Sequence, residues 1–144
     1  MDEAAAGVRA LEEAVGQELA GGAAKLVTVL VQNASSTTIV LSNFVLWGSG
    51  VWEPGGVPVL GQSFGPGVVT LLNGVSDAYG SFGGSVNFTP ADGGQLTTTW
   101  NWSSGQTVAP SASSSSSTLS ATCWTANPQT TNPTVNFQIT AVTI

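Results

Sequence analysis

Side chains able to carry out acid–base or nucleophilic chemistry are scarce in this sequence. Beyond Lys25 the chain contains three acids, Glu53, Asp77 and Asp92, and no base, and the whole chain lacks histidine. Two carboxylates at the right separation can hydrolyse a glycosidic bond. Asp77 and Asp92, however, lie in segments with the composition of turns, where an aspartate usually hydrogen-bonds its own backbone. We therefore expect no catalytic residue and predict that the protein is not an enzyme.

Sites for a metal or a cofactor are not indicated either. A histidine-based zinc site is excluded by composition, and Ca²⁺ would need about six or more oxygen ligands, which no acidic loop here supplies. Cys123, the single cysteine, falls on the inward face of a predicted strand and is expected to be a buried structural thiol. Glu53, between Trp52 and Pro54, is expected to be an exposed charge at a loop tip. We expect no metal and no cofactor.

The charge of the chain excludes a further class of partner. Its 144 residues include two bases and eight acids, a net charge of −6, and charged residues make up 7% of the chain, against about 25% in an ordinary soluble domain. Two cations cannot neutralise the phosphates of a nucleic acid, so no nucleic-acid partner is expected. The acidic N-terminus lacks the basic and apolar regions of a secretory signal. We expect a protein that is cytoplasmic, or secreted without a conventional signal peptide.

Residues 1–22 have the pattern of an amphipathic α-helix, which we predict to precede the main domain. Asp2 is a good N-cap, and Gly21-Gly22 is a natural stop. A narrow apolar stripe recurs at helical spacing and consists of Val8, Leu11, Val15 and Leu19. Such a helix could insert into a membrane with this stripe towards lipid. Alternatively, it could pack on the domain or pair with another copy of the chain through the stripe.

Residues 23–144 are predicted to form an antiparallel β-sandwich, so the fold class is mainly β with a preceding helix. Short β-branched and apolar runs alternate with turns rich in glycine and proline, a pattern typical of sandwiches and barrels. The predicted strands are 25–32, 37–47, 67–72, 82–88, 95–102, 118–124 and 134–144. The serine-rich segment Pro110–Ser117 is predicted to be a flexible surface loop, because serine tracts bury little apolar area.

The aromatic residues are the most informative ones in the predicted sandwich. Trp47 and Trp100 are expected in the core, because large aromatic side chains dominate such cores. Trp52 is predicted at a loop tip, where an exposed indole suits a membrane interface or a platform for stacking sugars. We predict that Trp52, Tyr79, Trp102 and Trp124 form a membrane-binding or ligand-binding surface. The surrounding Ser, Thr, Asn and Gln suit a neutral carbohydrate better than an ionic partner.

Short motifs carry a resemblance to known β-sandwich proteins. The order of several segments resembles that of the actinoporins, which are pore-forming cytolysins with a detachable N-terminal helix. These segments are the amphipathic segment, Lys25–Val29 leading into Asn33-Ala34-Ser35, Gly67–Gly74 and Asp92–Leu96. Fungal lectins share that sandwich. Leu46-Trp47-Gly48, Pro90–Gly93 and Trp100-Asn101-Trp102 are similar to the aegerolysins, which are lipid-binding β-sandwich proteins. These motifs lie within residues 1–105.

The chain also departs from both families. Actinoporins are basic and have a tyrosine-rich phosphocholine site, whereas this chain is acidic and Tyr79 is its single tyrosine. No headgroup site can therefore be transferred residue by residue. Aegerolysins begin at the first strand and leave the N-terminal segment unexplained.

Two binding functions are consistent with this sequence, and an inert structural or storage protein is a third hypothesis. The resemblance implies a membrane-active, cytolysin-like and pore-forming defence protein that binds membrane lipid and assembles as a homo-oligomer. The alternative is a lectin or immunomodulatory protein of the same fold, which binds cell-surface glycans and uses the N-terminal helix for oligomerisation.

Overall fold

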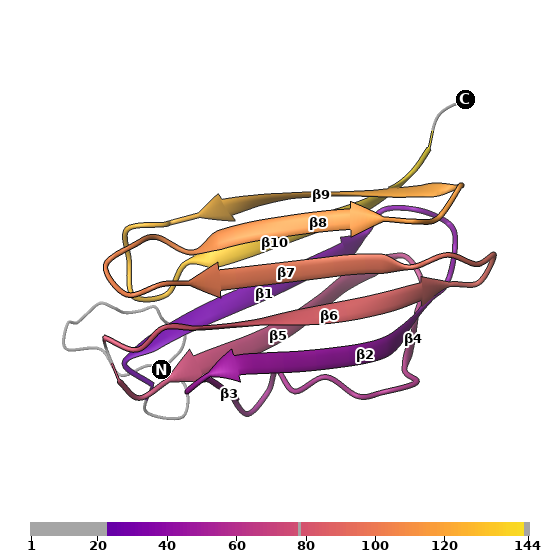
Figure 1. Ribbon diagram of the computed structural model, residues 1–144. Helices are drawn as coiled ribbons and strands as arrows, with labels where there is room; N and C mark the ends of the chain where they lie inside the picture. Colours follow the sequence, from indigo (N-terminus) through magenta and orange to yellow (C-terminus); the bar gives the residue numbers. More distant parts are fainter. Residues whose placement is uncertain (1–22, 78, 143–144) are drawn as a thin grey trace.

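The computed structural model describes residues 23–77 and 79–142, which form a β-sandwich (Figure 1). Its strands are β1 (Lys25–Asn33), β2 (Ile39–Gly48), β3 (Val51–Trp52), β4 (Ser63–Phe64), β5 (Gly67–Val75), β6 (Phe82–Pro90), β7 (Leu96–Trp102), β8 (Ala109–Ser114), β9 (Leu119–Ala126) and β10 (Thr134–Ala141). All seven predicted strands are present, with bounds shifted by a few residues. The predicted helix over 1–22 lies outside the described residues, so the boundary at residue 22 stays a prediction.

Two five-stranded sheets make up the two layers. Sheet A has the order β3-β5-β1-β10-β9, and sheet B has the order β4-β2-β6-β7-β8. Neighbouring strands are antiparallel except β1 and β10, which are parallel. The prediction of a mainly β sandwich is confirmed, and the strands are antiparallel as predicted except for the parallel pair β1 and β10.

The prediction of a flexible loop over Pro110–Ser117 is wrong for its first part. Residues Ala109–Ser114 form β8, which pairs along its whole length with β7 at the edge of sheet B, whereas residues 115–117 lie outside any strand. An edge strand needs only backbone hydrogen bonds on one side, so small side chains are sufficient to form it. The serines that follow satisfy the turn into β9: Ser114 Oγ donates to the Leu119 carbonyl, and Ser116 Oγ accepts from the Thr118 and Leu119 amides.

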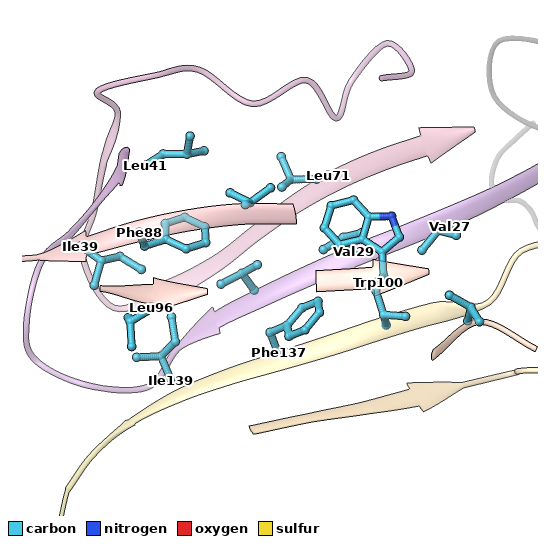
Figure 2. Packing of buried hydrophobic residues seen from close by; sticks show 14 of the residues in the cluster. Val27, Val29, Ile39, Leu41, Leu71, Phe88, Leu96, Trp100, Phe137 and Ile139 are labelled. Carbon is cyan, nitrogen blue, oxygen red and sulfur yellow. The ribbon is translucent and has the colours of Figure 1, made fainter. Parts of the chain in front are cut away.

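The hydrophobic core lies between the two sheets (Figure 2). Alternating residues of β6, β7 and β10 point into it, because successive side chains of a strand face opposite sides. Trp100 is fully buried among residues that include Val27, Val29 and Phe137. Its indole Nε1 donates to Asn73 Oδ1 at 2.8 Å, and Asn73 is also buried. Cys123 is half-buried and packs against this core as a free thiol.

The loop between β3 and β4 covers one open side of the sandwich. Near its start, Glu53 N donates to the Leu72 carbonyl of β5, and Leu72 N donates to the Gly56 carbonyl. Near its end, Leu41 N of β2 donates to the Gln62 carbonyl. The loop therefore bridges the edge of sheet A to the edge of sheet B.

Candidate functional site

A β-bulge in β2 decides which tryptophan reaches the surface. The pairing of β2 with β6 shifts register between Leu41 and Asn43. Such a bulge reverses the faces of the residues that follow it. Phe44 consequently packs against the core, and Trp47 lies on the outer face with 37% of its surface exposed. The expectation that Trp47 is a core residue is wrong for this reason.

The indole of Trp47 is held in place across two neighbouring strands. Trp47 is the register partner of Gly83 on β6, and Gly83 is the partner of Asn101 on β7. Trp47 Nε1 donates to Asn101 Oδ1 at 2.8 Å. A β-carbon at Gly83 would lie 2.6 Å from Trp47 Nε1, so the indole passes over Gly83 because that residue has no side chain.

Tyr79 lies on a loop at the same end of the sandwich as Trp47. Gly48 abuts the Ser81 backbone, and Gly80 lies close to Ser49 Oγ, so the β2–β3 and β5–β6 connections are in contact. Tyr79 is the most exposed large side chain there, at 83%. We call this surface the aromatic end; its exposed residues are Trp47, Ser49, Tyr79, Ser81 and Asn101.

Two residues of the predicted ligand surface lie beneath the aromatic end instead of on it. Trp102 has 6% of its surface exposed, and its Nε1 donates to the Gln106 carbonyl at 2.9 Å. Trp52 forms the short strand β3 and packs edge-to-face on Phe44 at 5.8 Å and Trp100 at 6.0 Å. The prediction that these two tryptophans lie on the ligand surface is therefore wrong. Trp102 shares the inward face of β7 with Trp100, and the pairing of β3 with β5 draws Trp52 inward.

Lys25 provides a buried cation behind the same end. Its Nζ lies 4.5 Å from the centre of the Trp102 ring and 5.7 Å from that of Phe82, and it donates to the Gly80 carbonyl at 3.1 Å. Burial lowers the pKa of Lys25, and the negative charge of Asp77 opposes that shift. Two aromatic rings and a backbone carbonyl thus stabilise the charge of the buried ammonium group, and the hydrogen bond to Gly80 anchors the β5–β6 loop.

The remaining predicted residue lies on a different surface. Trp124 on β9 is 48% exposed and faces outward from sheet A, since Cys123 packs towards the core. The structure therefore leaves Tyr79 at the aromatic end, buries Trp102, and half-buries Trp52 against the core. It also separates Trp124 from the other three. Trp47 takes the exposed place that the sequence pattern assigned to Trp52.

Glu53 is buried, which corrects its expected position at an exposed loop tip. Glu53 has 6% of its surface exposed, and its side chain lies against Gly74, because the loop docks on β5. Burial raises the pKa of Glu53. The folded protein thus keeps this proton to a higher pH than the unfolded chain does.

This burial predicts a pH-dependent loss of stability. The free energy of unfolding should fall as the pH rises from the ordinary glutamate pKa through the raised one, because the folded state binds more protons there. Glu53→Gln should remove this component and stabilise the protein at neutral pH. Urea unfolding between about pH 4 and about pH 7 would measure both variants. Asp92→Asn, at an exposed turn, is the control; parallel curves for wild type and Glu53→Gln would refute the prediction.

Other kinds of site find no support in the described part of the chain. Residues 23–77 and 79–142 contain no group of three or more His, Cys, Asp or Glu that could hold a metal ion. Within the same ranges, no helix is long and apolar enough to cross a bilayer.

Comparisons with known proteins agree on the architecture. No protein-family model and no curated protein matches the sequence. Among solved structures, RahU in complex with a TRIS molecule is similar at a TM-score of 0.63 and 18% identity, covering 84% of this chain and 98% of that one. The chain therefore shares the β-sandwich fold of RahU.

Two further structures share this fold. The lipid-binding protein Nakanori gives a TM-score of 0.61 at 16% identity, covering 82% of this chain and 72% of that chain. IP-1A from Alcaligenes faecalis gives a TM-score of 0.58 at 10% identity, and the match covers 83% of this chain and 93% of that chain. Identities this low establish a common fold and nothing finer.

Proposed function

We propose that this protein is a non-enzymatic lipid-binding protein that docks on membranes through the aromatic end. The observation that carries the proposal is the pair of exposed aromatic residues there: Trp47, held by Asn101, and Tyr79 on the adjoining loop. Tryptophan and tyrosine favour the membrane–water interface, because one part of each side chain is apolar and the other forms hydrogen bonds. The fold shared with the lipid-binding protein Nakanori supports the same reading.

The charges of the described residues favour a neutral membrane over an anionic one. Asp77 and Asp92 are exposed, whereas Lys25 is buried. No exposed cation in residues 23–77 and 79–142 is thus available to attract anionic lipid. The proposed membrane is therefore one of neutral or zwitterionic lipids.

Vesicle flotation would test docking. Wild-type protein should float with phosphatidylcholine vesicles and less with vesicles that also contain phosphatidylserine. Trp47→Ala should weaken binding about tenfold or more, because an anchoring indole is lost. Trp124→Ala is the matched control, since it removes a tryptophan from another surface where it is somewhat more exposed, at 48% against 37%. Equal losses in both variants, or no flotation of the wild type, would reject the aromatic end as the docking site.

We further propose that docking is followed by insertion of the N-terminal segment, as in a pore-forming cytolysin. The apolar stripe of Val8, Leu11, Val15 and Leu19 lies outside the described residues, and its role rests on the sequence pattern. Dye release from the same vesicles is the second readout. Leu11→Glu should abolish release while flotation persists. Ala6→Glu adds the same charge on the opposite face of the predicted helix and should have little effect; release by both variants would exclude insertion through the stripe.

A further inference from the structure

The outer face of sheet A carries a second exposed tryptophan whose surroundings differ from those of Trp47. On β9, Trp124 is the register partner of Asn136 on β10, and Thr122 is the partner of Gln138. Gln138 is in turn the partner of Gln32 on β1. Because side chains two apart on a strand share a face, these residues form one polar surface around the indole.

The polar groups of this surface are free to bind something else. Within the described residues, the side chains of Trp124, Asn136 and Gln138 form no hydrogen bond with the protein. Further along the same face, the hydroxyls of Ser120 and Thr140 are hydrogen-bonded to each other. On the outer face of sheet B, the Trp47 side chain is hydrogen-bonded to Asn101. The face of sheet A therefore presents an indole with its N–H available beside unpaired amide donors and acceptors.

The chemistry of this surface selects the class of ligand. A pyranose ring has a C–H face that can stack on an indole and hydroxyl groups at its edge that bond to amides. Asn136 lies opposite Trp124, and Gln138 lies about 7 Å further along β10, a spacing that one sugar ring can bridge. Neither the tryptophan nor its polar neighbours carry a charge, so carboxylated or sulfated sugars gain no ion pair here.

We propose that Trp124, Asn136, Gln138 and Thr122 form a binding site for a neutral glycan, separate from the aromatic end. Trp124 stacks on a pyranose ring, and the amides of Asn136 and Gln138 bond to its hydroxyls. A lipid surface is less suited to this face, because the residues next to the indole are amides and hydroxyls. Two apolar residues share this face: Leu30 on β1 is the register partner of Asn136, and the exposed Val68 on β5 is the register partner of Gln32. One strand separates Leu30 from β9, and two strands separate Val68 from it.

A glycan array with neutral and sialylated oligosaccharides is the first test, followed by calorimetric titration of the neutral oligosaccharide that binds best. We expect binding to neutral glycans and little to their sialylated counterparts. Trp124→Ala should weaken binding at least tenfold and Gln138→Ala several-fold, whereas Trp47→Ala should bind as the wild type does. Circular dichroism of each variant would confirm that it is folded.

Three results would overturn the proposal: no neutral glycan bound by the wild type, full binding by Trp124→Ala, or equal loss in Trp47→Ala and Trp124→Ala. The two sites can also fail separately. If the wild-type protein does not bind vesicles but binds a glycan, and Trp124→Ala abolishes the glycan binding, lipid docking is refuted and the glycan site is supported. If the wild-type protein binds vesicles through Trp47 but binds no neutral glycan, only the glycan site is refuted.

Discussion

Trp100→Ala is expected to lower the free energy of unfolding by about 3–5 kcal/mol, because a fully buried tryptophan leaves a large cavity. The change also leaves Asn73 Oδ1 without its donor in a buried position. An unsatisfied buried acceptor costs about 1–3 kcal/mol more. Since a domain of this size is stable by only about 5–15 kcal/mol, we expect a largely unfolded or aggregated product.

Urea unfolding followed by far-ultraviolet circular dichroism would measure this loss. Trp124→Ala is the matched control, because it removes the same side chain from an exposed position and should change stability by about 0.5 kcal/mol or less. Trp100→Phe restores part of the volume but not the hydrogen bond, so it should fall between the two. A cooperative transition for Trp100→Ala near that of the wild type would show that the indole is not central to the core.

Gly83→Ala should be the second most damaging change, although it adds only one methyl group. The new β-carbon would lie 2.9 Å from Asn101 Cα and 2.6 Å from Trp47 Nε1, and it would also meet the Trp100 carbonyl. Backbone atoms of the paired strand cannot move aside without loss of ladder hydrogen bonds, so we expect a cost of about 1–3 kcal/mol. The displaced indole should also lose its bond to Asn101 and, with it, much of the proposed lipid binding.

Thermal unfolding and vesicle flotation would together test this change. Gly65→Ala is the control, because a β-carbon at Gly65 meets no atom within 4 Å and the residue does not have a positive φ. That variant should behave as the wild type in both assays. A stable Gly83→Ala protein with unchanged flotation would contradict the close packing of Trp47 over β6.

Local pattern was sufficient for much of the sandwich. In β7, Leu96, Thr98 and Trp100 alternate with polar residues, and all three are buried as that alternation predicts. In β10, Val135 and Phe137 follow the same rule. The period-two pattern works there because both strands run without a bulge inside a sheet that is buried on one face.

The candidate sites could not be predicted in the same way. In β2, alternation continued from Ile39 and Leu41 places Trp47 inward. The bulge reverses the phase after Leu41, and it is set by pairing with β6, a strand distant in sequence. The sequence contains one signal for this bulge. Unbroken alternation would turn the polar Asn43 towards the core, whereas a shift in phase turns the apolar Phe44 and Leu46 inward.

The sequence by itself determined the absence of histidine, the scarcity of charge and the buried face of each regular strand, since these depend on residue type and local periodicity. The tertiary structure alone decided which aromatic residues reach solvent. Docking of the β3–β4 loop on β5 buries Glu53, and pairing of β3 with β5 draws Trp52 inward. Pairing with β7 makes Ala109–Ser114 an edge strand. Each of these outcomes depends on backbone groups that find partners far along the chain, and a local pattern contains no information about those partners.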